Sequence, residues 1–241
     1  MDGDQLEQPS PDSRLQAYED VGTRLRAYRE RAGIGVRELA RRVGVSPSMI
    51  SQIETGKTQP SVSTLYAVVS ELAVSLDELF APNGAVSGRD NSQDATVDGG
   101  EQAARERDQF VVSPSVAEPG SPVQRADRRK AIRLAGGVRW DRLTAQHDRD
   151  VDFLYVVYEP GAASSEAHSY MRHAGKEYGI VLRGRLAVAV GFEEYVLGPG
   201  DSISFDSTTP HRLWNPGDEP VHGIWVVIGR YAGPPQTASS T

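Results

Sequence analysis

The spacing of apolar residues changes once along the 241-residue chain, and this change constrains the fold more than any other feature. From residue 20 to residue 80, apolar residues recur at every third or fourth position, as in Val21, Leu25 and Tyr28, which predicts about five short helices. Beyond residue 111 they alternate in short runs bounded by Gly and Pro, which predicts an antiparallel β barrel or sandwich. We therefore expect two domains rather than one.

The stretch between these two patterns is rich in Asn, Gly, Ser and Asp, and such residues bury too little apolar surface to order a chain. We expect a linker in this position. The predicted boundaries are a disordered tail at 1–18, a helical domain at 19–80, a linker at 81–110, a β domain at 111–232 and a disordered tail at 233–241.

Composition excludes several kinds of protein. The chain has no cysteine, which excludes disulfides, thiolate metal sites and cysteine nucleophiles. No apolar run approaches the roughly 20 residues of a membrane span, and the acidic N-terminus lacks the residue order of a signal peptide. We therefore expect a cytoplasmic protein without a membrane partner.

Positive charge is concentrated in the helical part, although the formal net charge of the whole chain is −7. Residues 21–60 hold eight Lys and Arg against three Glu, which is a local charge of +5, whereas residues 61–110 hold three against nine acidic residues. A basic module within an acidic chain is typical of a domain that binds the phosphate backbone of DNA.

The residues that follow Gly44 predict a recognition helix. Ser46 is a favourable N-cap, and Pro47 is a favourable first residue of a helix. Four polar residues fall on one arc of this helix, opposite Ile50 and Ile53, namely Ser48, Ser51, Gln52 and Thr55. Hydroxyls and an amide suit the donors and acceptors of a major groove, and Gln52 can bond an adenine edge. The alternative is a small helical bundle whose polar face is only solvated.

The stretch Glu38–Ser61 resembles the helix-turn-helix of the lambda-repressor and Cro class, the xenobiotic-response-element family of regulators. The resemblance spans residues 20–80 and rests on Leu39-Ala40, Gly44, Ile53-Glu54 and Gly56-Lys57. It implies a five-helix domain that binds double-stranded operator DNA as a homodimer. The implied DNA-binding residues are Arg37, Arg41, Ser46, Ser48, Ser51, Gln52, Thr55 and Lys57, of which Arg37, Arg41 and Lys57 contact the sugar-phosphate backbone.

The β part carries two stretches, His173–Leu186 and Gly198–Asn215, that resemble the first and second motifs of the cupin family. The resemblance organises residues 123–231 and implies a double-stranded β-helix, or jelly-roll barrel. His173, Glu177 and His211 match the family's ligand positions, whereas Met171 stands where the first histidine is expected.

Geometry explains how these residues can form a site. Ala174-Gly175 permits a tight reversal, so His173 and Glu177 can face one interior, with Gly179 and Val181 continuing the same face. Two histidines and one carboxylate suit Fe(II), and the same donors suit Zn, Ni or Mn. The alternative is that the three residues hydrogen-bond one another or an organic acid in a barrel without metal.

Three functions are compatible with this organisation. The leading hypothesis is a sequence-specific transcription regulator without enzyme activity, in which the cupin domain senses a small molecule or a metal. The same domain order also resembles hydroxypropylphosphonate epoxidase, a non-haem Fe(II) cupin enzyme, in which the helical domain would be structural. In a third hypothesis the barrel only dimerises. The basic helical module and its polar arc favour the regulator, because an enzyme has no use for them.

Overall fold

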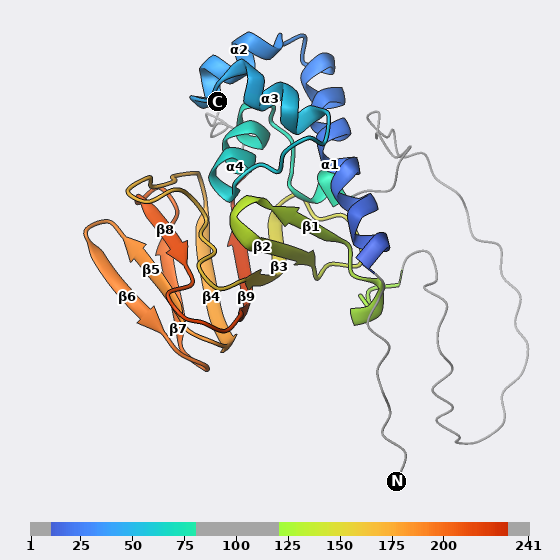
Figure 1. Ribbon diagram of the computed structural model, residues 1–241. Coiled ribbons are helices and arrows are strands. Elements are labelled where there is room, and N and C mark those ends of the chain that lie inside the picture. Colours follow the sequence, from blue (N-terminus) through green and yellow to red (C-terminus); the bar gives the residue numbers. More distant parts are fainter. Residues whose placement is uncertain (1–10, 81–120, 231–241) are drawn as a thin grey trace, which may run out of the picture.

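The computed structural model describes residues 11–80 and 121–230, which form a helical domain and a β domain (Figure 1). The expected linker at 81–110 and the expected C-terminal tail at 233–241 lie outside the described residues. The first helix begins at Pro11, eight residues before the expected start of the helical domain at residue 19. Within the described residues, no helix is both long enough and apolar enough to cross a membrane.

The helical domain contains four α-helices and one 3-10 helix in its described part. They are α1 (Pro11–Arg31), α2 (Val36–Val43), α3 (Pro47–Glu54), α4 (Val62–Glu71) and the 3-10 helix η1 (Asp77–Phe80). The expectation of five α-helices is corrected here, because the fifth element is a single turn of four residues. Ser75 and Glu78 form a reciprocal capping box around this turn, with Ser75 N donating to Glu78 Oε2 at 2.7 Å.

Local sequence signals account for the ends of α2, α3 and α4. Ser46 caps α3 by accepting a hydrogen bond from Met49 N at 3.1 Å, and Ser61 caps α4 in the same way through Thr64 N. Gly44 ends α2 in the left-handed conformation, with φ of 73°, which a residue with a side chain rarely adopts. These signals set the α2-turn-α3 geometry.

A buried ion pair joins the first and third helices. Arg29 of α1 donates two hydrogen bonds, of 2.6 and 2.8 Å, to the two carboxylate oxygens of Glu54 in α3. Both side chains are less than a tenth exposed. The bidentate pairing satisfies both charges and fixes the C-terminal end of α3 against α1.

The β domain is a two-sheet jelly roll, as the cupin resemblance implies. Its strands are β1 (Ala131–Leu134), β2 (Val138–Arg142), β3 (Val151–Tyr158), β4 (Lys176–Arg183), β5 (Leu186–Val190), β6 (Glu193–Leu197), β7 (Ser202–Asp206), β8 (His211–Trp214) and β9 (Val221–Ile228), with the 3-10 turns η2 (Ala126–Arg128) and η3 (Ala135–Gly137). One sheet has the order β1-β2-β3-β9-β4-β7, and the other has the order β6-β5-β8. Neighbouring strands in both sheets run antiparallel.

Residues along each strand of the barrel alternate between its interior and its outer surface. In β4, Glu177, Gly179 and Val181 are buried while the residues between them are exposed, which confirms the predicted face. In β9, which pairs with β4, Trp225 and Val227 point to the same interior. The carboxylate of Glu177 therefore lies in the barrel interior.

The helical domain packs on the β domain through α1, which lies against β1, and through α4, which lies between the recognition elements and the sheets (Figure 1). Ser63 N donates to Ser164 O at 3.1 Å, and Ala135 N donates to Pro60 O at 2.9 Å. Asp77 of η1 accepts a hydrogen bond of 2.8 Å from Arg142 of β2. One apolar cluster runs continuously from α4 into the barrel, so the two domains share a packed interface.

Candidate DNA-binding surface and metal centre

The polar arc of α3 that is predicted to face DNA, here called the reading face, is exposed in the structure. Ile50 and Ile53 are buried against the helical core. The polar residues on the opposite arc, Ser48, Ser51, Gln52 and Thr55, are all exposed, as is the capping residue Ser46. Helical periodicity alone predicted this division, because the apolar side chains of a short amphipathic helix must face the core.

Side-chain contacts order the exposed arc. Gln52 Nε2 donates to Ser48 Oγ at 3.4 Å, one turn earlier in the helix. Thr55 Oγ1 donates to the carbonyl of Ser51 at 2.8 Å. Met49 of the same helix is 42% exposed and is among the residues that line the groove between the two domains.

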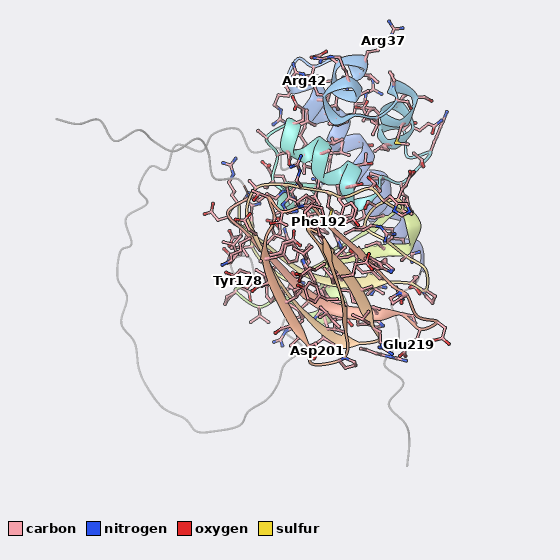
Figure 2. The ribbon with its side chains drawn as sticks, turned by 90° about the vertical axis from the view of Figure 1, so that its left-hand side faces the viewer. Arg37, Arg42, Tyr178, Phe192, Asp201 and Glu219 are labelled. Carbon is pink, nitrogen blue, oxygen red and sulfur yellow. The ribbon has the colours of Figure 1, made fainter. Side chains whose placement is uncertain are left out.

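Basic residues flank the reading face. Arg37, Arg41 and Lys57 are exposed, and Figure 2 places Arg37 and Arg42 at the end of the helical domain far from the β domain. Arg41 pairs with Glu38 at 2.6 Å within α2, and Arg42 bridges Glu38 and Glu71. The hydrogen bonds from these arginines lower the pKa of Glu38 to about 2. The pairing with Glu38 uses Arg41 Nε and Nη2, and Nη1 is not part of it.

The three predicted metal ligands converge in the barrel from two sheets. His173 precedes β4, Glu177 lies in β4, and His211 begins β8 of the other sheet. His173 Nε2 lies 3.0 Å from Glu177 Oε1, and His211 Nε2 lies 3.1 Å from the same oxygen. One ligand atom from each of the three residues lies within 4.8 Å of the others.

The turn between His173 and Glu177 depends on a glycine. Gly175 has φ of 106°, and a Cβ there would lie 2.6 Å from the carbonyl oxygen of Ile228. Another residue type would therefore clash with β9 as well as strain the backbone. This reversal brings both side chains into one interior, as the sequence predicted.

The hydrogen bonds of the two histidines determine which ring nitrogens face the carboxylate. His173 Nδ1 lies 2.9 Å from the carbonyl oxygen of Ala174, and His211 Nδ1 lies 2.8 Å from that of Thr209. A carbonyl only accepts, so each Nδ1 carries the proton and donates it. Where the ring is neutral, its Nε2 lone pair then points at Glu177 Oε1, which is itself an acceptor.

This arrangement leaves three lone pairs opposed in a buried space. Among the described residues, no hydrogen-bond partner is found for His173 Nε2, His211 Nε2 or Glu177 Oε1, although the short distances meet the criterion for ion pairs. Opposed acceptors at about 3 Å repel one another unless a proton or a cation lies between them. The donor set fits a divalent cation, since a metal-bound histidine usually donates its other N–H to a carbonyl or carboxylate.

Trp225 and Gly179 orient the carboxylate from the opposite side. Trp225 Nε1 donates a buried hydrogen bond of 2.7 Å to Glu177 Oε2, so that Oε1 faces the histidines. A Cβ on Gly179 would lie 2.0 Å from the Trp225 ring, so only glycine leaves room for the indole. The sequence alone does not indicate this positioning role of Trp225, because strand pairing between β4 and β9 creates the contact.

Glu177 stays ionised in this buried site only where positive charge lies beside it. Burial raises the pKa of its carboxyl, whereas hydrogen bonds and charge from protonated His173 and His211 lower that pKa below the usual range. Between neutral imidazoles, a bound cation would have to supply that charge. Met171, at the position of the missing histidine, forms a β-bridge with His211 through two backbone hydrogen bonds of 3.0 Å. Its buried side chain lines a small space together with Glu177, so three residues rather than four could supply nitrogen and oxygen ligands there.

Family comparisons agree with both domains. Residues 25–79 match the helix-turn-helix family model, and residues 154–227 match the cupin domain model. The chain is 25% identical over 201 residues to the HTH-type transcriptional regulator PuuR of Escherichia coli, covering 80% of this chain and 86% of that protein. A crystal structure of an HTH_3 family transcriptional regulator from Vibrio cholerae shares the fold, with a TM-score of 0.56 and 18% identity over 89% of this chain and 97% of that chain.

These findings define a two-domain, DNA-binding transcription regulator with a C-terminal cupin domain. The chain belongs to the helix-turn-helix family of transcriptional regulators. Hydroxypropylphosphonic acid epoxidase from S. wedmorenis, covered over 98% of its chain and 88% of this one, has a TM-score of 0.39 and 18% identity, which is too low to argue for a shared activity. The comparisons therefore support the regulator over the enzyme.

Proposed function

We propose that this regulator senses a divalent metal ion, alone or with a small organic molecule, at His173, Glu177 and His211. The observation that carries the proposal is the convergence of two imidazole lone pairs and one carboxylate oxygen in a buried site. Such a site attracts a cation because the alternative is repulsion between buried acceptors. A bound ion would supply charge neutralisation and open coordination positions, and Fe, Zn, Ni and Mn all suit these donors.

The proposed complex with operator DNA forms in the cytoplasm. In this complex α3 enters the major groove. Gln52 and Ser48 contact base edges, together with Ser46, Ser51 and Thr55 on the same exposed arc. Arg37, Arg41 and Lys57 neutralise phosphates and position the helix without reading sequence. The exposure of this arc and the basic residues beside it support the assignment.

The proposed active form is a homodimer that pairs through the outer face of the large sheet. Tyr178, Ile180 and Leu182 of β4 are 42%, 37% and 48% exposed, and Ile228 of β9 is 43% exposed beside them. Figure 2 shows Tyr178 at an outer edge of the β domain. A second copy is the occupant that fits, because a helix-turn-helix protein reads a two-fold operator with two recognition helices.

The dimer is tested with the substitution Ile180→Glu and the control Glu194→Gln on the exposed strand β6. Sedimentation should show a monomer for Ile180→Glu and a dimer for the control, with operator affinity falling at least tenfold in the monomer. Metal binding should be unchanged, because Ile180 points away from the barrel interior. A dimer that survives Ile180→Glu would exclude this face.

Metal sensing is tested by titrating purified protein with Zn²⁺ and Co²⁺ by calorimetry, before and after treatment with a chelator. We expect one ion per chain in the natural protein and none in His211→Ala. Operator affinity, measured with and without the ion, should change in the natural protein and stay constant in His211→Ala. If His211→Ala keeps full metal binding and the same response, the triad is not the sensor.

A further inference from the structure

The helical domain covers the mouth of the barrel with one aromatic side chain. Tyr66 of α4 is only 5% exposed, and its ring centroid lies 4.6 Å from that of His173 and 5.2 Å from that of Trp140. One of the proposed metal ligands is therefore in direct contact with the DNA-binding domain.

Tyr66 also separates two spaces of very different size. The inner space, lined by Glu177 and Trp225 and roofed by Val62 and Tyr66, has a volume of about 10 Å³ and touches neither histidine. That is room for roughly one water molecule, and no organic molecule fits there. The outer space is a groove of about 1330 Å³ between the domains, and His173 is among the residues that line it. The atoms that face one another in the triad, His173 Nε2, His211 Nε2 and Glu177 Oε1, are nevertheless buried. Tyr66 and Met171 line both spaces, so they form the partition between them.

Arg230, which follows β9, clamps Tyr66 in this position. Its guanidinium carbon lies 3.6 Å from the centroid of the Tyr66 ring, within cation–π distance. Arg230 Nη2 donates to the carbonyl oxygen of Tyr66 at 3.2 Å, and Nη1 donates to Asp152 at 3.5 Å. The clamp holds both the ring and the backbone of α4 against the barrel.

The groove outside the partition suits an anion. Three arginines, Arg149, Arg172 and Arg230, and one carboxylate, Glu166, are among the residues that line it. Many of the remaining lining residues are small or carry hydroxyls, as Ser61, Ser63, Ser165 and Ser169 do. A carboxylate group matches both this charge and the open coordination positions of an ion held by three protein ligands.

We propose that Tyr66 is a gate, and that a small organic carboxylate reaches the barrel site only when α4 moves away from the barrel mouth. This inference rests on the proposed metal site. The docked arrangement is then the ligand-free state, because the facing atoms of the triad are buried while the Tyr66 ring lies against His173. Since α4 belongs to the DNA-binding domain, the ligand changes how the recognition helices are placed, and DNA and ligand affect each other's affinity reciprocally.

If Tyr66 is a gate, removing its side chain should change the affinity of the protein for a small carboxylate. Full-length protein loaded with Co²⁺ is titrated with acetate, and binding is followed by the visible absorption of the ion. If the open state is populated at about 1 to 10%, Tyr66→Ala should bind acetate about 10- to 100-fold more tightly. The on-rate should rise by a similar factor, while Tyr66→Phe and the exposed-tyrosine control Tyr195→Ala should behave as the natural protein does.

A second variant keeps the test valid if Tyr66→Ala fails to fold. Arg230→Lys retains a cation beside Asp152 but loses the planar stacking on Tyr66, so it should also bind acetate more tightly than the natural protein. Equal acetate affinities and on-rates for the natural protein and the folded gate variants would overturn the gate. Failure of the proposed metal site gives a different result, because the absorption of bound Co²⁺ would then be absent from the natural protein as well.

Discussion

Trp225 Nε1 donates a hydrogen bond of 2.7 Å to Glu177 Oε2, and this contact determines which carboxylate oxygen faces the two histidines. The contact crosses from β9 to β4 inside the barrel and is buried. Because the indole has one donor and no acceptor, it holds the carboxylate in one orientation. The triad is therefore arranged before any ion binds.

Trp225→Phe should weaken metal binding more than it unfolds the protein. The substitution keeps most of the apolar volume but leaves Glu177 Oε2 without its donor, which costs about 1 to 3 kcal/mol of stability. Loss of an orienting partner of a ligand typically lowers metal affinity by about 10- to 100-fold. Calorimetric titration with Zn²⁺ measures this, with Trp214→Phe as the control. An unchanged Zn²⁺ affinity would show that Trp225 is only a packing residue.

Glu177→Gln distinguishes a metal site from a buried ion pair. In a metal site the histidines are neutral, and the introduced amide can donate to an Nε2 lone pair. The free energy of unfolding of the metal-free protein should then stay within about 1 kcal/mol of the natural value, while metal binding is lost.

A larger loss of stability is expected if the three residues form a buried ion pair instead of a metal site. If both histidines are charged and pair with Glu177, removing the carboxylate leaves buried charge uncompensated and costs about 3 to 5 kcal/mol. Denaturant unfolding in the presence of a chelator measures the difference, with the exposed Glu194→Gln as the matched control. A loss of that size would argue against the metal site.

Gln52→Ala and Lys57→Ala should have different effects on DNA binding. Gln52→Ala should relax preference at one base position by about 1 to 3 kcal/mol. Lys57→Ala should weaken all sequences similarly and reduce the salt dependence by about one phosphate contact. Selection from random DNA followed by salt titration separates the two effects, and equal loss of specificity from both would contradict the assignment.

Asp152 should make stability depend on pH near the interface between the domains. Burial raises its pKa from 3.8 to about 6, with Arg230 and His173 opposing the shift and Asp77 adding to it. A raised pKa means that the folded state binds the proton more tightly than the unfolded chain does. The associated stability is present below about pH 4 and is lost as the pH rises to about 6.

Relative to Asp152→Asn, the natural protein should therefore lose stability over this window, by at most about 1.4 kcal/mol per pH unit. Denaturant unfolding between pH 4 and pH 7 measures the difference, with the exposed Asp150→Asn as the control. A difference that does not vary with pH would show that Asp152 remains ionised throughout.

Much of the DNA-binding surface was predictable from sequence because its determinants are local. The N-cap Ser46, the turn at Gly44 and the spacing of Ile50 and Ile53 act within a few residues of the helix that they define. Helical periodicity then assigns the exposed arc without knowledge of the rest of the chain.

The convergence of the three proposed metal ligands was predictable for a different reason. Their spacing around a glycine reversal, and the motif that His211 occupies, indicate one interior before any strand is placed. Their tautomers were not predictable, since these depend on the carbonyls of Ala174 and Thr209.

The contact between the two domains was decided only by tertiary structure. Tyr66 and Arg230 are 164 residues apart, and nothing near either residue in the sequence indicates that they meet. Periodicity assigns a residue to a buried face but does not say which partner covers that face. The sequence by itself therefore determined two domains, a reading helix and a set of ligands. Packing of α4 on the barrel placed Tyr66 against His173, since long-range contacts depend on the shapes of both folded surfaces.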